Sequence, residues 1–307
     1  MTLRSSGDLL ADRRYAWAEA ALAEDDFSAA ADLAEQVLER VPGYGPAWIV
    51  LGRARARLVG GDEAARDAFA RALALDPDDA LGAGLHLAEL GDTPGDALSP
   101  AYVRALFDGY APRFERHLVE GLGYRGPEMI RDVLRGLAAG RGRPLHFGRA
   151  LDLGCGTGLV GAAFSGLVGS LAGVDLSPAM LARARAGGAY DRLAVGDLAG
   201  FLGAEPAGVA DLIVAADVFI YLRDLAPAFA AAARALAPGG LFAFTLQSHP
   251  GDGTVLGADG RYAHGEDVLD AARNAAGLAT AAMTVAAIRR QNGLGVPGRI
   301  VVLERRG

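Results

Sequence analysis

A glycine-rich loop between a short apolar strand and a helix constrains the fold of this chain most strongly. Residues 150–159 read Ala-Leu-Asp-Leu-Gly-Cys-Gly-Thr-Gly-Leu, with glycine at every second position from Gly154 to Gly158. Glycine lets a backbone approach a ligand without a Cβ in the way, and a helix that starts after such a loop offers free N–H groups. The pattern predicts a nucleotide-binding site in a doubly wound α/β domain.

Apolar runs and helical stretches alternate after Arg149. The expected strands cover 150–153, 171–175, 192–195, 212–215 and 241–246, and the expected helices cover 159–167, 178–186 and 226–236. This alternation predicts a parallel sheet with right-handed crossovers. The last two apolar segments, 279–288 and 299–303, flank a loop rich in turn residues and predict an antiparallel hairpin at the sheet edge. The sequence Pro238-Gly239-Gly240 predicts a tight turn before the fifth strand.

Four aspartates mark the ends of four successive expected strands: Asp152, Asp175, Asp197 and Asp217. Ligands of open α/β sheets bind at the carboxyl ends of the strands, so we expect these side chains to surround one ligand. Asp175 follows the glycine loop by about 20 residues, where a carboxylate can accept hydrogen bonds from ribose hydroxyls. A helix cap is the alternative role for any one of these aspartates.

The first ninety or so residues predict helices only. Two stretches, 26–42 and 62–77, each run from an acidic turn through small residues to a proline, and the two prolines are about one tetratricopeptide period apart. With Trp48-x-x-Leu51-Gly52, the region resembles two tetratricopeptide repeats plus a partial third helix near 81–90. The resemblance implies a peptide or protein partner. A helical hairpin with no binding role is the alternative.

The spacing of the glycines separates two families of nucleotide site. A dinucleotide fingerprint would read G-x-G-x-x-G, whereas this chain has Gly154-x-Gly156-x-Gly158 preceded by Asp152. That arrangement resembles the first motif of class I S-adenosylmethionine-dependent methyltransferases. The resemblance extends over about residues 102–304. It implies a Rossmann-like, seven-stranded, mostly parallel sheet with a C-terminal antiparallel hairpin.

The resemblance implies S-adenosylmethionine as cofactor and assigns roles to residues at the expected sheet edge. Asp152 would meet the ammonium group of the cofactor directly or through water, and Asp175 would bind the ribose. Asp197 would accept a hydrogen bond from the adenine amino group, with the N–H of Leu198 nearby.

Further cofactor contacts are implied by the same resemblance. Met180 would cover the adenine ring, and Ala216 with Asp217 would lie by the methionine moiety and the methyl acceptor. The segment 102–118 resembles the helical lid that precedes the sheet in many of these enzymes. In that lid Tyr110 would contact the cofactor and Arg113 could meet its carboxylate.

The combination of the repeats, the lid and Leu122-Gly123-Tyr124-Arg125 resembles a bacterial group of predicted methyltransferases with N-terminal tetratricopeptide repeats. It implies three parts: a tetratricopeptide-like domain at 1–95, a helical lid and linker at 96–148, and a methyltransferase domain at 149–307. The acceptor would be a small molecule or a protein side chain.

Methyl transfer from a sulfonium is an in-line displacement, so holding the acceptor and the methyl group within about 3–3.5 Å can supply most of the acceleration. A base is needed only where the acceptor must lose a proton. The polar side chains expected to face an acceptor are His117, Tyr124, Tyr221, Gln247 and His249. Among them His117, His249 and Tyr221 are the candidate catalytic residues.

Two other functions are compatible with parts of the pattern. A nicotinamide-dependent dehydrogenase shares the doubly wound fold, but the glycine spacing and Asp197 as an adenine partner argue against it. The other is a non-catalytic S-adenosylmethionine-binding protein or tetratricopeptide adaptor, in which the repeats would bind a peptide and the α/β domain would be a catalytic relic. Such a relic would have lost acidic residues that this chain retains.

Composition excludes several classes. All 30 basic residues are arginine, which excludes a Schiff-base lysine and a P-loop lysine. The net charge of −7 disfavours nucleic acid as a partner. We expect no membrane span, no metal site and a cytoplasmic protein, because the apolar runs are short and Cys155 is the single cysteine. Cys155 is interpreted as a small residue filling its loop.

Overall fold

A computed structural model describes residues 5–92, 96–115, 121, 123–291 and 294–307. The chain divides into two compact units, Met1–Gly109 and Tyr110–Gly307. Among the described helices, none combines the length and the apolar character that crossing a membrane requires.

The first unit is built from helices. They are α1 (Leu9–Ala23), α2 (Phe27–Arg40), α3 (Gly45–Arg55), α4 (Asp62–Leu75), α5 (Ala83–Glu89) and most of α6 (Pro100–Tyr110). Each of the first four helices packs against the next one along the chain. The expected all-helical region is confirmed, and the partial third helix lies within the range predicted for it.

Small residues allow the helices of the first unit to approach closely. A Cβ on Gly52 of α3 would lie only 2.4 Å from the Phe69 ring of α4, so this contact requires glycine. Buried alanines such as Ala18 and Ala34 line the interface between α1 and α2. The indole N–H of Trp48 donates to the carbonyl of Pro42 at 2.9 Å and fixes the start of α3. The assignment of these helices to tetratricopeptide repeats stays a prediction.

The second unit contains a seven-stranded sheet in the order β3-β2-β1-β4-β5-β9-β8. The strands are β1 (Phe147–Leu153), β2 (Val168–Asp175), β3 (Arg192–Val195), β4 (Ala210–Ala215), β5 (Leu236–Gln247), β8 (Leu278–Gln291) and β9 (Leu294–Arg305). Strands β1 to β5 are parallel, and β9 is antiparallel to both β5 and β8. The predicted α/β fold with a closing antiparallel hairpin is therefore confirmed.

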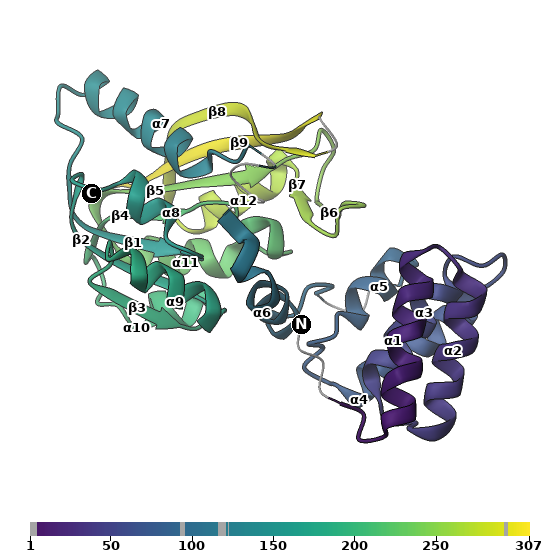
Figure 1. Cartoon of the computed structure of the whole chain (residues 1–307). Coiled ribbons are helices and arrows are strands. Elements are labelled where there is room, and N and C mark those ends of the chain that lie inside the picture. Colours follow the sequence, from purple (N-terminus) through teal and green to yellow (C-terminus); the bar gives the residue numbers. More distant parts are fainter. Residues whose placement is uncertain (1–4, 93–95, 116–120, 122, 292–293) are drawn as a thin grey trace. The chain divides into compact units, whose positions relative to one another are not determined.

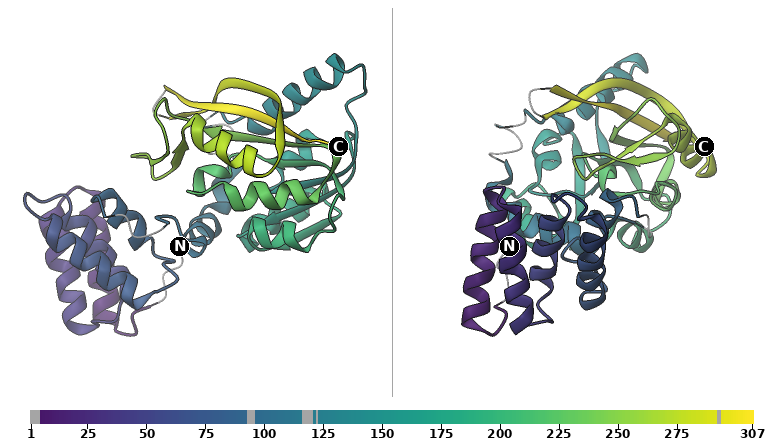
Figure 2. Two further views of the ribbon diagram at one scale, coloured as in Figure 1. Left: turned by 180° about the vertical axis from the view of Figure 1, so that it is seen from behind. Right: turned by 90° about the vertical axis from the view of Figure 1, so that its right-hand side faces the viewer.

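Helices cover both faces of this sheet. They are α7 (Gly126–Gly140), α8 (Leu159–Ala163), α9 (Pro178–Gly187), α10 (Leu198–Ala204), α11 (Ala226–Ala235) and α12 (Glu266–Ala275). Figure 1 views the sheet from the side of α7 and α8, and the left panel of Figure 2 from the side of α11 and α12.

The two faces have separate apolar cores because side chains alternate along each strand. Leu212 and Val214 of β4 pack with α7 and α8, whereas Ile213 packs with α10, α11 and α12. Burial on both faces explains why the strands read as apolar runs in the sequence.

The structure departs from the predicted elements in several places. The predicted helix 159–167 ends at Ala163, and the helices α10 and α12 were not predicted. The small hairpin β6 (Thr254–Leu256) and β7 (Tyr262–His264) was also missed, since strands of three residues leave little pattern.

The sequence Pro238-Gly239-Gly240 lies inside β5. The prediction of a tight turn before this strand is therefore wrong. Pairing with β4 shifts here from Ala210 opposite Leu236 to Leu212 opposite Leu241. The extra residues form a bulge, and Gly239 accommodates it with a φ of 75°.

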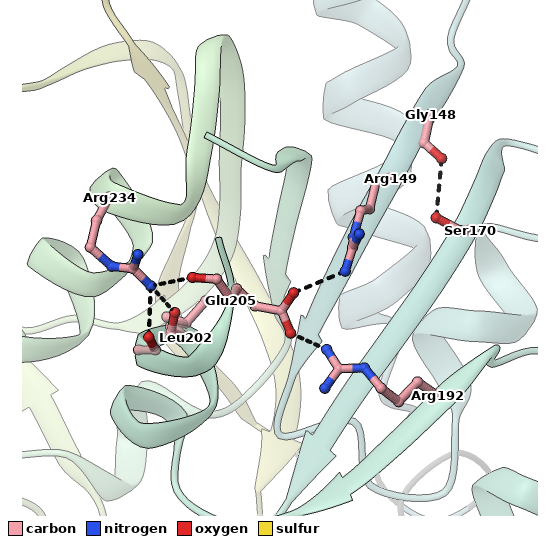
Figure 3. Close-up of polar contacts among 8 residues, drawn as sticks. Gly148, Arg149, Ser170, Arg192, Leu202, Glu205 and Arg234 are labelled. Atoms are coloured by element: carbon pink, nitrogen blue, oxygen red, sulfur yellow. Dashed lines mark hydrogen bonds and ion pairs between the residues drawn. The ribbon is translucent and has the colours of Figure 1, made fainter. Parts of the chain in front are cut away.

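An ion network anchors the amino ends of the strands (Figure 3). The buried carboxylate of Glu205, which follows α10, accepts from Arg149 of β1 at 2.9 Å and from Arg192 of β3. The guanidinium of Arg234 in α11 donates to backbone carbonyls around the end of α10. These contacts hold the sheet together at the edge opposite the glycine loop, so they leave the carboxyl edge free for a ligand.

Candidate functional site

The glycine loop adopts a backbone that only glycine takes without strain. Gly154, Gly156 and Gly158 have φ values of 65°, 53° and 99°. A Cβ on Gly154 would also lie 2.6 Å from Val218, whereas no atom of the described residues lies within 4 Å of a Cβ built on Gly156. The loop is thus packed against the protein at Gly154 and open at Gly156.

Asp175 connects the end of β2 to this loop. Its Oδ2 accepts from the N–H of Gly156 at 2.9 Å, and its Oδ1 accepts from the N–H of Ser177 at 2.8 Å. A carboxylate offers about four lone-pair sites, so it can accept from several donors at once. The structure places Asp175 beside the glycine loop, as the prediction required.

Asp152 lies at the carboxyl end of β1 and has no solvent exposure. The hydroxyl of Tyr190 donates to its Oδ2 at 2.6 Å, while Oδ1 has no hydrogen-bond partner among the described residues. Burial raises the pKa of Asp152 to about 8, although the Tyr190 hydrogen bond lowers it and nearby Asp175 raises it further. The side chain is a buried acceptor with one unsatisfied oxygen below the loop.

Tyr190 was not predicted as a site residue. Its hydroxyl also accepts from the N–H of Gly161 at 3.2 Å. A Cβ on Gly158, Gly161 or Gly173 would come within 3.2 Å of its ring. The three glycines are separated in the sequence, so their shared contact with the Tyr190 ring can be recognised only in the folded structure.

The residues predicted to surround the adenine differ in their exposure. Met180 is fully buried in the first turn of α9, so its side chain faces the protein interior and does not line an open adenine site. Leu176, half-buried directly after Asp175, is the accessible apolar side chain at this corner. Asp197 is exposed and its Oδ1 caps α10 by accepting from Gly200 at 2.8 Å. Leu198 begins that helix and is partly buried against the core.

The predicted lid residues lie near the corner of Asp175. Tyr110 is half-buried with its ring edge-on to Phe114 at 5.3 Å, and the exposed Arg113 lies 6.0 Å from the Tyr110 ring centre. The carbonyl of Pro112, in the short helix η1 (Ala111–Arg113), accepts from Arg183 of α9 at 3.2 Å. This contact ties the lid segment to the helix that follows Asp175. The candidate base His117 lies outside the described residues.

Ala216 and Asp217 follow β4, and both are half-buried. Asp217 has one partner for its backbone and one for its side chain. The N–H of Asp217 donates to the Thr245 hydroxyl at 2.7 Å, and its Oδ1 accepts from Arg289 at 3.0 Å. The carboxylate is therefore engaged in an ion pair that the sequence did not reveal.

The remaining candidate bases have structural partners. His249 accepts from the N–H of Gly251 through Nδ1 and donates from Nε2 to the carbonyl of Gly253, so both ring nitrogens organise its own loop. Tyr221 lies in the short helix η3 (Phe219–Tyr221) and shares a side-chain hydrogen bond with Arg261. Burial raises the pKa of Tyr221, which keeps its phenol protonated at neutral pH.

These elements define a doubly wound domain with a nucleotide site at the carboxyl ends of β1 and β2. Its strand order and closing hairpin are those of the Rossmann-like methyltransferase fold. Residues 151–244 match a protein-family model described as a methyltransferase domain, which covers β1 to β5 and the glycine loop.

A curated relative is similar to part of this chain. The human protein methyltransferase-like protein 27 is 41% identical over 91 residues, which cover 29% of this chain. The match spans 35% of the length of that relative.

Solved structures share the fold at low sequence identity. Magnesium protoporphyrin IX methyltransferase from Synechocystis, solved with bound S-adenosylhomocysteine, has a TM-score of 0.50 and 17% identity over 67% of this chain and 99% of its own. The [4+2]-cyclase SpnF has a TM-score of 0.52 and 17% identity over 66% of this chain and 95% of its own. Since one of these proteins is a cyclase, the reaction must be argued from the site.

S-adenosylmethionine is the cofactor that the methyltransferase-domain match assigns to this segment, and the residues present fit it. The unpartnered Oδ1 of Asp152 can accept from an ammonium group. The open side of Gly156 leaves space for a ligand, and the carboxylate of Asp175 lies beside it. The described residues contain no group of three or more His, Cys, Asp or Glu that could hold a metal ion.

Proposed function

We propose that the protein is an S-adenosylmethionine-dependent methyltransferase acting on a small-molecule or protein acceptor. The observation that carries this proposal is the assembly of Asp152, the glycine loop and Asp175 within the segment that matches a methyltransferase domain. When bound, the cofactor supplies a methyl group on a positively charged sulfur. The finer assignment, also proposed, is the cytoplasmic bacterial group with N-terminal tetratricopeptide repeats.

The chain's own residues would bind and orient the cofactor. Asp152 would accept from the ammonium group and Asp175 from the ribose hydroxyls. Leu176 would replace Met180 as the apolar cover of the adenine ring, because Met180 is buried. Asp197 would use the carboxylate oxygen that does not cap α10 to accept from the adenine amino group, with the N–H of Leu198 nearby.

Further contacts would come from Tyr110 and Arg113 of the lid and from Ala216 and Asp217 after β4. None of the candidate bases with described positions is well suited to take a proton at neutral pH. Both ring nitrogens of His249 are engaged by its own loop, and the phenol of Tyr221 stays protonated. Alignment of acceptor and methyl group would therefore supply the acceleration.

Calorimetric titration with S-adenosylhomocysteine tests the site. We expect the intact protein to bind it, and Asp175→Asn to weaken binding by about 10- to 100-fold, since hydrogen bonds to a charged group are worth about 1.5–3 kcal/mol. Asp211→Asn is the matched control, because Asp211 also accepts a backbone N–H, from Arg149 at 2.9 Å, but at the opposite edge of the sheet. Absence of binding to the intact protein would refute the proposal.

Methyl transfer itself is tested with radiolabelled S-adenosylmethionine and a cell extract. Label in protein or in small molecules identifies the acceptor class. A protein that binds S-adenosylhomocysteine but transfers no label would instead be the non-catalytic binding protein or adaptor. A nicotinamide-dependent dehydrogenase would change the fluorescence of a reduced nicotinamide cofactor, and we expect no such change.

A further inference from the structure

A buried arginine of β8 lies at the carboxyl edge of the sheet, beyond the glycine loop and Asp175. The side chain of Arg289 in β8 is 1% exposed. Its guanidinium donates to Asp217 at 3.0 Å, to Gln247 at 2.7 Å and to Asp259 at 3.3 Å. An arginine that is buried and holds three partners fixes their relative positions, because its planar fork sets the directions of its hydrogen bonds.

The three partners of Arg289 come from three different segments. Asp217 follows β4, Gln247 ends β5, and Asp259 lies in the turn between β6 and β7. Since β4 pairs with β1, these segments adjoin the glycine loop on the side away from β2 and Asp175. This is the side of the site that the adenine and ribose contacts leave unused.

Asp217 needs support because its backbone is strained. Its φ is 60°, a left-handed value that costs free energy in residues other than glycine. Thr245, which bonds its N–H, and Arg289, which bonds its carboxylate, are both almost fully buried. Arg289 therefore helps to hold a strained residue at the end of β4.

The β6–β7 hairpin also needs support, since a two-stranded sheet is marginally stable alone. Its base is held by His264, whose Nε2 donates to the carbonyl of Leu222 at 2.9 Å, and by Thr254, whose hydroxyl donates to the carbonyl of Arg223 at 3.2 Å. Its tip is held through Asp259 by Arg289. This ion pair joins the tip of the hairpin to β8.

The tip carries a second arginine toward the site. Arg261, next to Asp259 in the turn, is half-buried and shares a hydrogen bond with Tyr221. Its charge also acts on Tyr110 of the lid. A fixed tip therefore keeps the guanidinium of Arg261 close to Tyr110 of the lid and to Tyr221 of η3.

We propose that Arg289 is a positioning residue for the methyl acceptor. It locks the tip of the β6–β7 hairpin to the ends of β4 and β5, so that Arg261, Tyr110 and Tyr221 form the acceptor-side wall. Arg289 acts through Asp259 and Asp217 and does not itself touch the acceptor. This role rests on the proposed methyltransferase function.

The experiment compares Arg289→Gln with the unchanged protein and with Arg299→Gln. Arg299 in the adjacent strand β9 pairs with the exposed Glu266 at 3.0 Å and serves as the matched control. Label transfer from radiolabelled S-adenosylmethionine is measured over dilutions of extract and of cofactor. Amide hydrogen exchange follows residues 254–264, and thermal melting reports whether each variant folds.

We expect Arg289→Gln to raise the half-saturating extract concentration or lower the maximal transfer by about tenfold or more. Half-saturation by cofactor should change by a smaller factor, because Asp217 is only one of the proposed cofactor contacts. Exchange in 254–264 should rise while that in β1 and β2 stays the same. Arg299→Gln should behave like the unchanged protein. A purely structural role would affect cofactor and acceptor use together.

A second variant keeps the proposal testable if Arg289→Gln unfolds. Asp259→Asn releases the tip but leaves the Arg289–Asp217 pair intact, and it should give the same selective loss of acceptor use. The double variant should lose no more acceptor use than Arg289→Gln alone, because both substitutions remove the same Arg289–Asp259 contact. Normal transfer by both single variants would overturn the positioning role alone. No transfer by the unchanged protein would refute the proposed function and this role with it.

Discussion

Asp152 shows how a single buried carboxyl can link the site to pH. Burial raises its pKa to about 8, so at pH 7 the side chain is mostly protonated in the free protein. An ammonium group beside its unpartnered Oδ1 would favour the carboxylate. Binding of the cofactor should therefore release a proton.

This leads to a prediction for binding as a function of pH. The affinity for S-adenosylhomocysteine should rise by about tenfold or more between pH 6 and pH 8 and level off above, because the carboxylate form binds and dominates only above its pKa. Calorimetry at pH 7 in buffers of different ionisation enthalpy should show the proton release, and Asp152→Asn should abolish it. An affinity independent of pH over this range would contradict the assignment of Asp152.

Single residues also show what could be predicted from the sequence. Asp152, Asp175 and the glycines follow from a strand–loop–helix pattern, and the structure places them together. Met180 was misassigned because a residue in the first turn of a helix can face either the ligand or the core, and spacing alone does not decide. Arg289 was missed because its partners are 30 to 72 residues away in the chain.

At the scale of elements, long apolar strands were predictable and short or irregular ones were not. Strand β4 contains its predicted range, since nearly all of its residues are buried and form a clear apolar run. The β6–β7 hairpin has three residues per strand among glycines and aspartates, so no periodicity marks it. The bulge of β5 was interpreted as a turn because both use Pro-Gly sequences.

The bulge yields a prediction for stability. Gly239→Ala should lower the free energy of unfolding by about 1 kcal/mol, because alanine at a φ of 75° is strained although no atom lies within 4 Å of the new Cβ. Chemical denaturation measures the change. Gly203→Ala in α10 is the control, since its φ is not positive and its Cβ also meets open space. An equal loss in both variants would show that the backbone at Gly239 is not the cause.

At the scale of the whole molecule, two units with separate cores predict separable tasks. If the N-terminal helices bind a protein acceptor, removing residues 1–95 should abolish label transfer to it and leave the affinity for S-adenosylhomocysteine unchanged. Scintillation counting of protein fractions and calorimetry measure the two effects. Undiminished transfer by the shortened protein would exclude an acceptor-binding role for the helices.

The overall class of the second unit was predictable because the alternation of strands and helices leaves few topologies. The proposed acceptor side was not, because its wall combines residues from the lid, η3 and the small hairpin, which an arginine of β8 holds in place. Only the folded sheet brings those segments to one edge.

The position of β9 has a consequence for how the protein is made. This strand follows β8 in the chain yet lies between β5 and β8 in the sheet. On the ribosome, β8 therefore emerges before the strand that must join it to the sheet. Arg289 can reach Asp217 and Gln247 only after β9 has been inserted, so the acceptor side of the site should mature last during synthesis.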